Sequence, residues 1–169
     1  MFVQSGIGIK KTMMKNKCVF LCCLLFCLPV HAAEYASLKH NEVNLRTGPG
    51  EKFPILWVYQ EKNFPVQVMD SFETWRQIRE KDGTIGWVHQ NMLKKTRYVI
   101  VEKEGSLLND KSPESAAVAV VQPGVIARIE SCPKGPYCRI TVSDENNTKT
   151  GWFLRSFLWG LDKGELISR

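Results

Sequence analysis

Acidic residues and long apolar runs are both missing from the start of this sequence. The first 33 residues contain no Asp or Glu, and four lysines precede an apolar run at residues 18–30. That run has 13 residues, whereas a helix that spans a membrane needs about 20. A basic start, a short apolar run and then small residues are typical of a secretory signal peptide. We predict a signal peptide at residues 1–32, cleavage after Ala32 or Ala33, and no stable membrane insertion once it is removed.

A lipid anchor is disfavoured by a second missing feature. Cys27 follows apolar residues, but a lipid-attachment signal has a small residue before the cysteine, and Phe26 is bulky. We interpret the four cysteines of this segment as apolar residues of the signal helix.

Excess positive charge is largely confined to the leader. The formal net charge of +6 falls to +2 when four lysines are removed, because 19 basic residues then face 17 acidic ones. Nucleic-acid binding requires a clustered basic face, and the remaining chain offers only Lys94-Lys95-Thr96-Arg97, which we interpret as a solvated linker. We predict no nucleic-acid partner.

Only two cysteines remain after removal of the leader, Cys132 and Cys138, separated by Pro133-Lys134-Gly135-Pro136-Tyr137. In an oxidising compartment they are candidates for a disulfide. A zinc site would need further ligands, and a catalytic redox pair has two intervening residues rather than five. We favour a structural disulfide over these two alternatives.

Residues that commonly carry catalysis are scarce as well. The mature chain retains only His40 and His89, no Ser lies in a nucleophile elbow, and the carboxylates are scattered among lysines. Paired carboxylates for sugar hydrolysis depend on spatial separation, which the sequence does not give. We predict no catalytic residue, no cofactor and no metal site.

What the sequence has in abundance is strand patterning. Apolar and polar residues alternate in Val43–Arg46 and stop at Thr47-Gly48-Pro49-Gly50, as when a strand enters a tight loop. A turn at Asp82-Gly83 then returns the chain into Gly86-Trp87-Val88. Further strand-like segments are residues 35–38, 55–59, 66–68 and 75–79.

These residues resemble a bacterial SH3-like (SH3b) domain. The family pattern has Asn-x-Arg-x-Gly-Pro, a Trp in mid-domain and Gly-Trp-Val near the end, here Asn44, Arg46, Gly48-Pro49, Trp75 and Gly86-Trp87-Val88. The resemblance covers about residues 35–95. It implies a small β-barrel that closes with one helical turn at residues 89–93, and a role in binding or targeting.

A weaker copy of the same order follows, with a period of roughly 62 residues. Trp75-Arg76-Gln77-Ile78 matches Tyr137-Cys138-Arg139-Ile140, and Gly86-Trp87-Val88 matches Gly151-Trp152-Phe153. We predict an all-β chain with two small SH3-like β-barrels in tandem: residues 34–95, a divergent domain at residues 96–160, and a C-terminal tail at residues 161–169. Because the expected Arg and Gly-Pro are absent from the second copy, a ligand site is less expected there.

Aromatic residues are numerous in the first copy, and they define a candidate groove. We predict that Tyr59, Trp75 and Trp87 wall it, that His89 lines it, and that Arg46 holds a ligand carboxylate through a forked pair of hydrogen bonds. The alternative is that Trp75 and Trp87 are simply core residues.

These observations favour a secreted, periplasmic or extracellular, non-catalytic binding protein of the bacterial envelope. Its expected partner is a cell-wall (peptidoglycan) peptide or an envelope protein. The alternative is a scaffold or inhibitor that acts only through protein contacts, and a cell-wall hydrolase is less expected.

Overall fold

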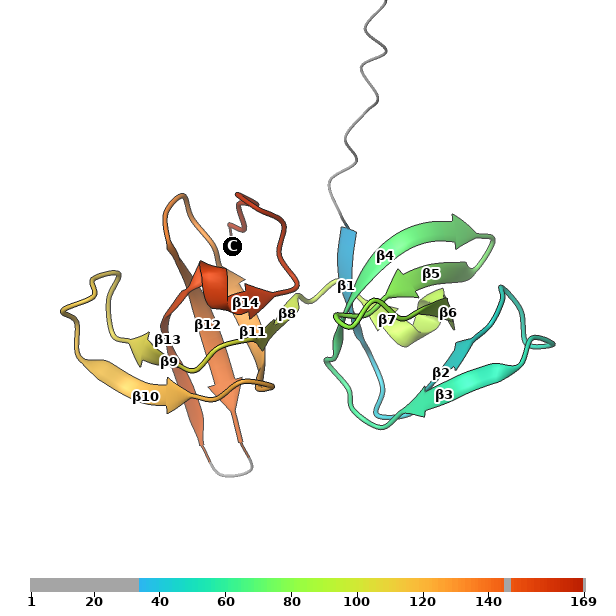
Figure 1. Cartoon of the computed structure of the whole chain (residues 1–169), viewed down its shortest axis with the longest axis horizontal. Helices are drawn as coiled ribbons and strands as arrows, with labels where there is room; N and C mark the ends of the chain where they lie inside the picture. Colours follow the sequence, from blue (N-terminus) through green and yellow to red (C-terminus); the bar gives the residue numbers. More distant parts are fainter. Residues whose placement is uncertain (1–33, 145–146, 169) are drawn as a thin grey trace, which may run out of the picture. The chain divides into compact units, whose positions relative to one another are not determined.

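The computed structural model describes residues 34–144 and 147–168, which form strands joined by tight turns and two 3-10 turns (Figure 1). The predicted signal peptide lies outside the described residues. Within those two ranges, no helix has the length and apolar character needed to cross a membrane. The all-β prediction is confirmed.

The first barrel is a seven-stranded antiparallel sheet with the order β3-β2-β6-β5-β4-β1-β7. Its strands are β1 (Glu34–Leu38), β2 (Val43–Arg46), β3 (Ile55–Tyr59), β4 (Pro65–Phe72), β5 (Trp75–Arg79), β6 (Ile85–His89) and β7 (Leu93–Lys94). A 3-10 turn, η1 (Gln90–Met92), joins β6 to β7. The helical turn expected near the end of this domain is therefore present.

Alternation along the strands divides the first barrel into a core and an outer face. Val43 and Leu45 on β2 are 1% and 0% exposed, as the period of two requires. They join a cluster with the buried side chains Leu38, Tyr59, Val66, Ile78 and Val88. Residues that alternate with these buried ones along a strand, such as Asn44 on β2 and Trp87 on β6, therefore lie on the opposite face of the sheet.

The second barrel repeats this topology, with the order β10-β9-β13-β12-β11-β8-β14. Its strands are β8 (Tyr98–Val101), β9 (Gly105–Leu108), β10 (Ala117–Val121), β11 (Ile126–Ser131), β12 (Tyr137–Ser143), β13 (Thr148–Leu154) and β14 (Leu158–Trp159), with η2 (Arg155–Phe157) before the last. Each strand of the second barrel corresponds to the strand numbered seven lower in the first barrel, so that β8 corresponds to β1 and β14 to β7. The predicted tandem arrangement of two SH3-like barrels is thus confirmed.

A glycine occupies the same core position in both barrels and allows a leucine to pack directly on the backbone. A Cβ atom on Gly86 would lie 2.6 Å from Cγ of Leu45, and one on Gly151 would lie 2.8 Å from Cγ of Leu107. Only glycine leaves space for these side chains. The tryptophan after each glycine then points to the outer face, because successive side chains alternate.

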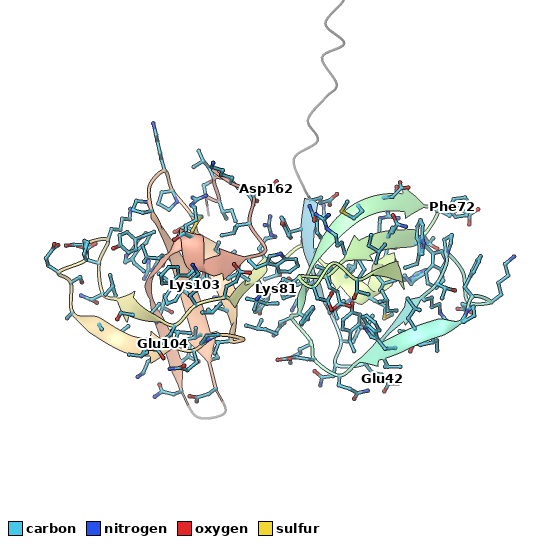
Figure 2. The ribbon with its side chains drawn as sticks, in the orientation of Figure 1. Glu42, Phe72, Lys81, Lys103, Glu104 and Asp162 are labelled. Carbon is cyan, nitrogen blue, oxygen red and sulfur yellow. A yellow bond between two sulfur atoms is a disulfide. The ribbon has the colours of Figure 1, made fainter. Side chains whose placement is uncertain are left out.

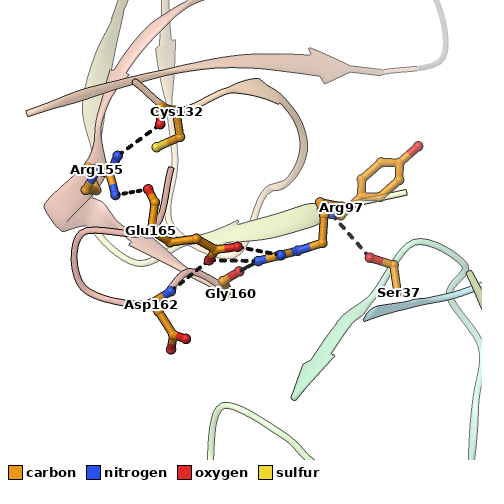
Figure 3. Close-up of polar contacts among 8 residues, drawn as sticks. Ser37, Arg97, Cys132, Arg155, Gly160, Asp162 and Glu165 are labelled. Carbon is orange, nitrogen blue, oxygen red and sulfur yellow. Dashed lines mark hydrogen bonds and ion pairs between the residues drawn. The ribbon is translucent and has the colours of Figure 1, made fainter. Parts of the chain in front are cut away.

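The disulfide and the C-terminal segment stabilise one end of the second barrel. Cys132 and Cys138 are bonded, as predicted, and both are fully buried in the core. Arg155 donates from Nη2 to the carbonyl oxygen of Pro133 at 3.0 Å and from Nη1 to that of Glu165 at 2.6 Å. Figure 3 shows Arg155 and Arg97 both turned toward the segment that carries Glu165. The residues predicted as a tail are therefore held by side-chain hydrogen bonds as far as Glu165.

Candidate functional site

Strand register gathers most of the predicted site residues on one face of the first barrel. Arg46 on β2 lies opposite Trp87 on β6, and Trp87 lies opposite Gln77 on β5. In the next row, Trp75 lies opposite His89. Directly opposed residues share a face, with Cβ atoms about 5 Å apart. We call this surface the Trp87 face and define it by Asn44, Arg46, Trp75, Gln77, Trp87 and His89.

A cleft of about 320 Å³ opens on this face. Three of the predicted residues, Arg46, Trp75 and His89, line it. The remaining lining residues are Glu42, Asn44, Glu51 and Met92. The cleft thus combines one guanidinium and two carboxylates with an aromatic pair.

Arg46 has both a structural role and free hydrogen-bonding capacity. Its Nη1 atom donates to the carbonyl oxygens of Glu51 and Phe53, each at 2.9 Å, and this holds the loop between β2 and β3 against the strand. A guanidinium has five N–H groups. Across residues 34–144 and 147–168, its Nε and Nη2 atoms have no hydrogen-bond partner, so they remain able to bind an anionic ligand group.

His89 is oriented by two local contacts. Its Nδ1 atom accepts a hydrogen bond from the backbone N–H of Asn91 at 3.2 Å and so caps η1. Its ring meets Trp75 edge to face, with centroids 5.5 Å apart and planes at 88°. Because Nδ1 accepts, the neutral ring carries its proton on Nε2. His89 therefore offers the cleft an N–H donor beside an indole.

Tyr59 and Trp87 do not line the cleft. Tyr59 is 8% exposed within the core, and its hydroxyl donates to Oε1 of Glu80 at 2.6 Å. Burial and the neighbouring Glu80 carboxylate raise the pKa of the Tyr59 hydroxyl well above its ordinary value. Trp87 is half-buried on the outer face, between Arg46 and Gln77.

The two acidic residues of the cleft were not among the predicted site residues. Glu42 lies two residues before Asn44, just ahead of β2 (Figure 2). Extending the alternation of β2 by one step would have placed it on the same face. Glu51 comes from the loop after β2, where no periodicity applies, so no sequence pattern could have identified it.

The charged and aromatic groups of the cleft are suited to binding a small charged ligand. Among residues 34–144 and 147–168, no group of three or more His, Cys, Asp or Glu side chains could hold a metal ion. The cleft instead offers a cation for a carboxylate, two carboxylates for an amine, and aromatic surface for an apolar stem. A short peptide with both kinds of charge matches these features.

Each of the two barrels matches a known protein family. A family model described as "Bacterial SH3 domain" matches residues 39–95. The first barrel is a bacterial SH3 domain. A second model, described as "GW (Gly-Tryp) dipeptide domain", matches residues 100–156, which include Gly151-Trp152. The predicted family resemblance is confirmed, and both matched families are binding modules, not catalytic domains.

The solved structures that are similar to the chain include three NlpC-type proteins. NlpC1 from Trichomonas vaginalis is 14% identical with a TM-score of 0.34, covering 78% of this chain and 47% of its own. NlpC2 from the same organism is 13% identical with a TM-score of 0.34, covering 75% and 48%. An NlpC/P60 family protein from Bacillus cereus ATCC 10987 is 14% identical with a TM-score of 0.33, covering 75% and 56%.

The chain therefore spans about half the length of these proteins. A search of curated proteins returned no match. Bacterial SH3 and GW domains occur in secreted or cell-surface proteins that contact cell-wall material.

Proposed function

We propose that this protein is a secreted, non-catalytic binding protein of the bacterial envelope, and that its bacterial SH3 domain binds a peptidoglycan stem peptide in the cleft of the Trp87 face. The observation that carries the proposal is the meeting of Arg46, Trp75 and His89 in one cleft with Glu42 and Glu51. Stem peptides present carboxylates and amines close together, which these charges complement.

Arg46 is the residue that tests this proposal most directly. Arg46→Ala should weaken binding of purified muropeptides by about 1 to 3 kcal/mol, because a charge-assisted hydrogen bond is lost. The same change removes the two bonds to the loop carbonyls, so the amide signals of Gly48 and Gly50 must be compared in parallel. Arg46→Lys keeps the charge but loses the fork and should fall between Ala and the wild type.

Lys134→Ala, an exposed cation in the disulfide loop, is the matched control and should leave affinity unchanged. Full affinity of Arg46→Ala with an intact loop would overturn the assignment of the cleft. Calorimetric titration of the mature chain provides the affinities.

An envelope protein as the sole partner is the alternative, in which the chain acts as a scaffold or inhibitor. Exposed apolar side chains on β3, at the edge of the first sheet, favour this option; Ile55 and Leu56 are 46% and 44% exposed. Retention on protein-free sacculi supports the peptidoglycan proposal, whereas retention only in the presence of envelope proteins supports the alternative. Release of muropeptides by concentrated protein would contradict the non-catalytic role.

Secretion is part of the proposal and has its own measurement. The mature protein is expected to begin at Ala33 or Glu34, in the periplasm or outside the cell. Intact mass of the exported protein should show loss of the leader. An uncut leader, or a diacyl addition on Cys27, would be incompatible with this processing.

A further inference from the structure

The second barrel has a counterpart of the Trp87 face in which the arginine stands on the other side of the tryptophan. Trp152 on β13 lies opposite Leu108 on β9 and opposite Arg139 on β12. In the first barrel the two places beside Trp87 belong to Arg46 and Gln77. The cation is thus transposed, from the β2 side of Trp87 to the β12 side of Trp152.

Arg139 is available to a ligand. Its neighbours Cys138 and Ile140 are fully buried, so Arg139 points away from the core, and its side chain is exposed. In the part of the chain that the structure describes, the guanidinium of Arg139 makes no hydrogen bond or ion pair. The second barrel has Leu108 where the first has Arg46, but Arg139 on β12 supplies a guanidinium on the other side of Trp152.

Lys111 adds a second cation at the same indole. Its Nζ atom lies 4.3 Å from the centroid of the Trp152 ring, a distance at which a cation–π interaction holds the ammonium in place. Trp152 itself is half-buried. The indole is thus flanked by a positioned ammonium and an unpaired guanidinium.

Acidic side chains limit what such a surface accepts. Asp110 precedes Lys111 and accepts a hydrogen bond from its backbone N–H at 2.7 Å, while Glu130 on β11 forms an ion pair with Arg128. A long run of phosphates would meet these carboxylates, and like charges repel. A single anionic group beside apolar surface is the better match.

We propose that Lys111, Arg139 and Trp152 form a second binding site, and that it takes a carboxylate of a peptide. This second site rests on the proposed function only for the class of its ligand, because its residues belong to the second barrel and not to the first. The chain would then hold two carboxylate sites, one on each barrel, and binding to a polymer with many stem peptides would gain from both.

The test uses the full mature chain carrying Arg46→Ala, in which the first site is weakened. The probe is a synthetic stem tetrapeptide with free carboxylates, and its fully amidated form is the matched probe. The free acid should shift the indole N–H signal of Trp152, and the amide should not. Adding Arg139→Gln should weaken this binding about tenfold, because one charge-assisted hydrogen bond is lost, and Lys111→Gln should weaken it further.

Lys149→Gln is the control, because Lys149 is an exposed cation on the same strand, three residues from Trp152 and so on the opposite face. Equal shifts with acid and amide, or unchanged affinity of Arg139→Gln, would overturn the second site. A shift of the Trp152 indole signal with a phosphate polymer, and none with the tetrapeptide, would also overturn it. In the wild type, tetrapeptide-induced signal shifts at Trp87 and His89 without a shift at Trp152 would overturn the second site alone. A shift at Trp152 without shifts at Trp87 and His89 would overturn the proposed first site alone.

Discussion

Arg97 and Glu165, which are 68 residues apart in the sequence, form a two-pronged ion pair. Nη1 donates to Oε1 at 2.7 Å and Nη2 to Oε2 at 3.2 Å, and Nη2 also donates to the carbonyl oxygen of Gly160 at 2.8 Å. The Glu165 carboxylate additionally accepts from the backbone N–H of Asp162 at 3.0 Å. This carboxylate therefore joins the residue before β8 to the C-terminal segment (Figure 3).

Glu165→Gln should lower the stability of the second barrel by about 1 to 3 kcal/mol, because a charge-assisted pair is lost and Arg97 keeps its charge. The side chains are about one-fifth exposed, 19% for Arg97 and 22% for Glu165, so solvent screens the pair only in part. Urea unfolding followed by the indole N–H signals of Trp152 and Trp159 measures the change. Lys163→Gln, an exposed neighbour, should unfold like the wild type; equal effects of the two changes would contradict the role of Glu165.

The disulfide gives a second stability prediction. Replacing Cys132 and Cys138 together by Ser should destabilise the second barrel by about 2 kcal/mol or more, because a short loop is no longer closed in the unfolded chain and two hydroxyls enter a fully buried site. Melting curves should show the loss in the second barrel with little change in the first. Maleimide labelling of the unreduced, denatured wild type should add no mass, and a mass shift would disprove the bond.

Glu80 predicts a pH dependence in the first barrel. Burial, aided by the nearby Asp82 charge, raises the pKa of the Glu80 carboxyl above its ordinary value of 4.5, while the Tyr59 hydrogen bond opposes the rise. The folded state then binds the proton more tightly than the unfolded state, so stability should fall as pH rises from about 4.5 through the folded pKa.

Glu80→Gln keeps an acceptor for Tyr59 but does not titrate, so its melting temperature relative to the wild type should be higher at pH 7 than at pH 3.5. Tyr59→Phe removes the opposing hydrogen bond and should extend the decline to higher pH. Melting temperatures between pH 3 and 8 provide the check. A constant difference between Glu80→Gln and the wild type across this range would rule out Glu80 as the source.

The paired glycines predict a steric effect. A Cβ atom at Gly86 would lie 2.6 Å from a Leu45 side-chain atom, and at Gly151 it would lie 2.6 Å from the backbone oxygen of Leu108. Gly86→Ala and Gly151→Ala should each cost about 1 to 3 kcal/mol, with Gly151→Ala the larger because backbone yields less easily than a side chain. Chemical denaturation tests this against Ser71→Ala, an exposed strand position that should be neutral. Equal stability of the two alanine variants and the wild type would refute the packing argument.

The sequence alone determined which segments form strands and, where apolar and polar residues alternate, which side chains face outward. Val43–Arg46 and Trp75–Arg79 are strands with the predicted bounds, and Arg46 and Trp87 lie outside the core, because a period of two fixes the face of every residue on such a strand. The internal repeat was readable for the same reason, since both copies place a glycine on the core side and a tryptophan after it.

Only the tertiary structure decided which side chains come together on those faces and which contacts they make. Ile55–Tyr59 is apolar throughout, so no alternation indicated that Tyr59 points into the core, where its hydroxyl meets Glu80. The bonds from Arg46 to the loop carbonyls depend on how the loop after β2 closes, and the position of Arg139 beside Trp152 depends on the register of the β12–β13 hairpin. Local patterns do not encode such pairings, because the register between two strands is set by the packing of the whole barrel.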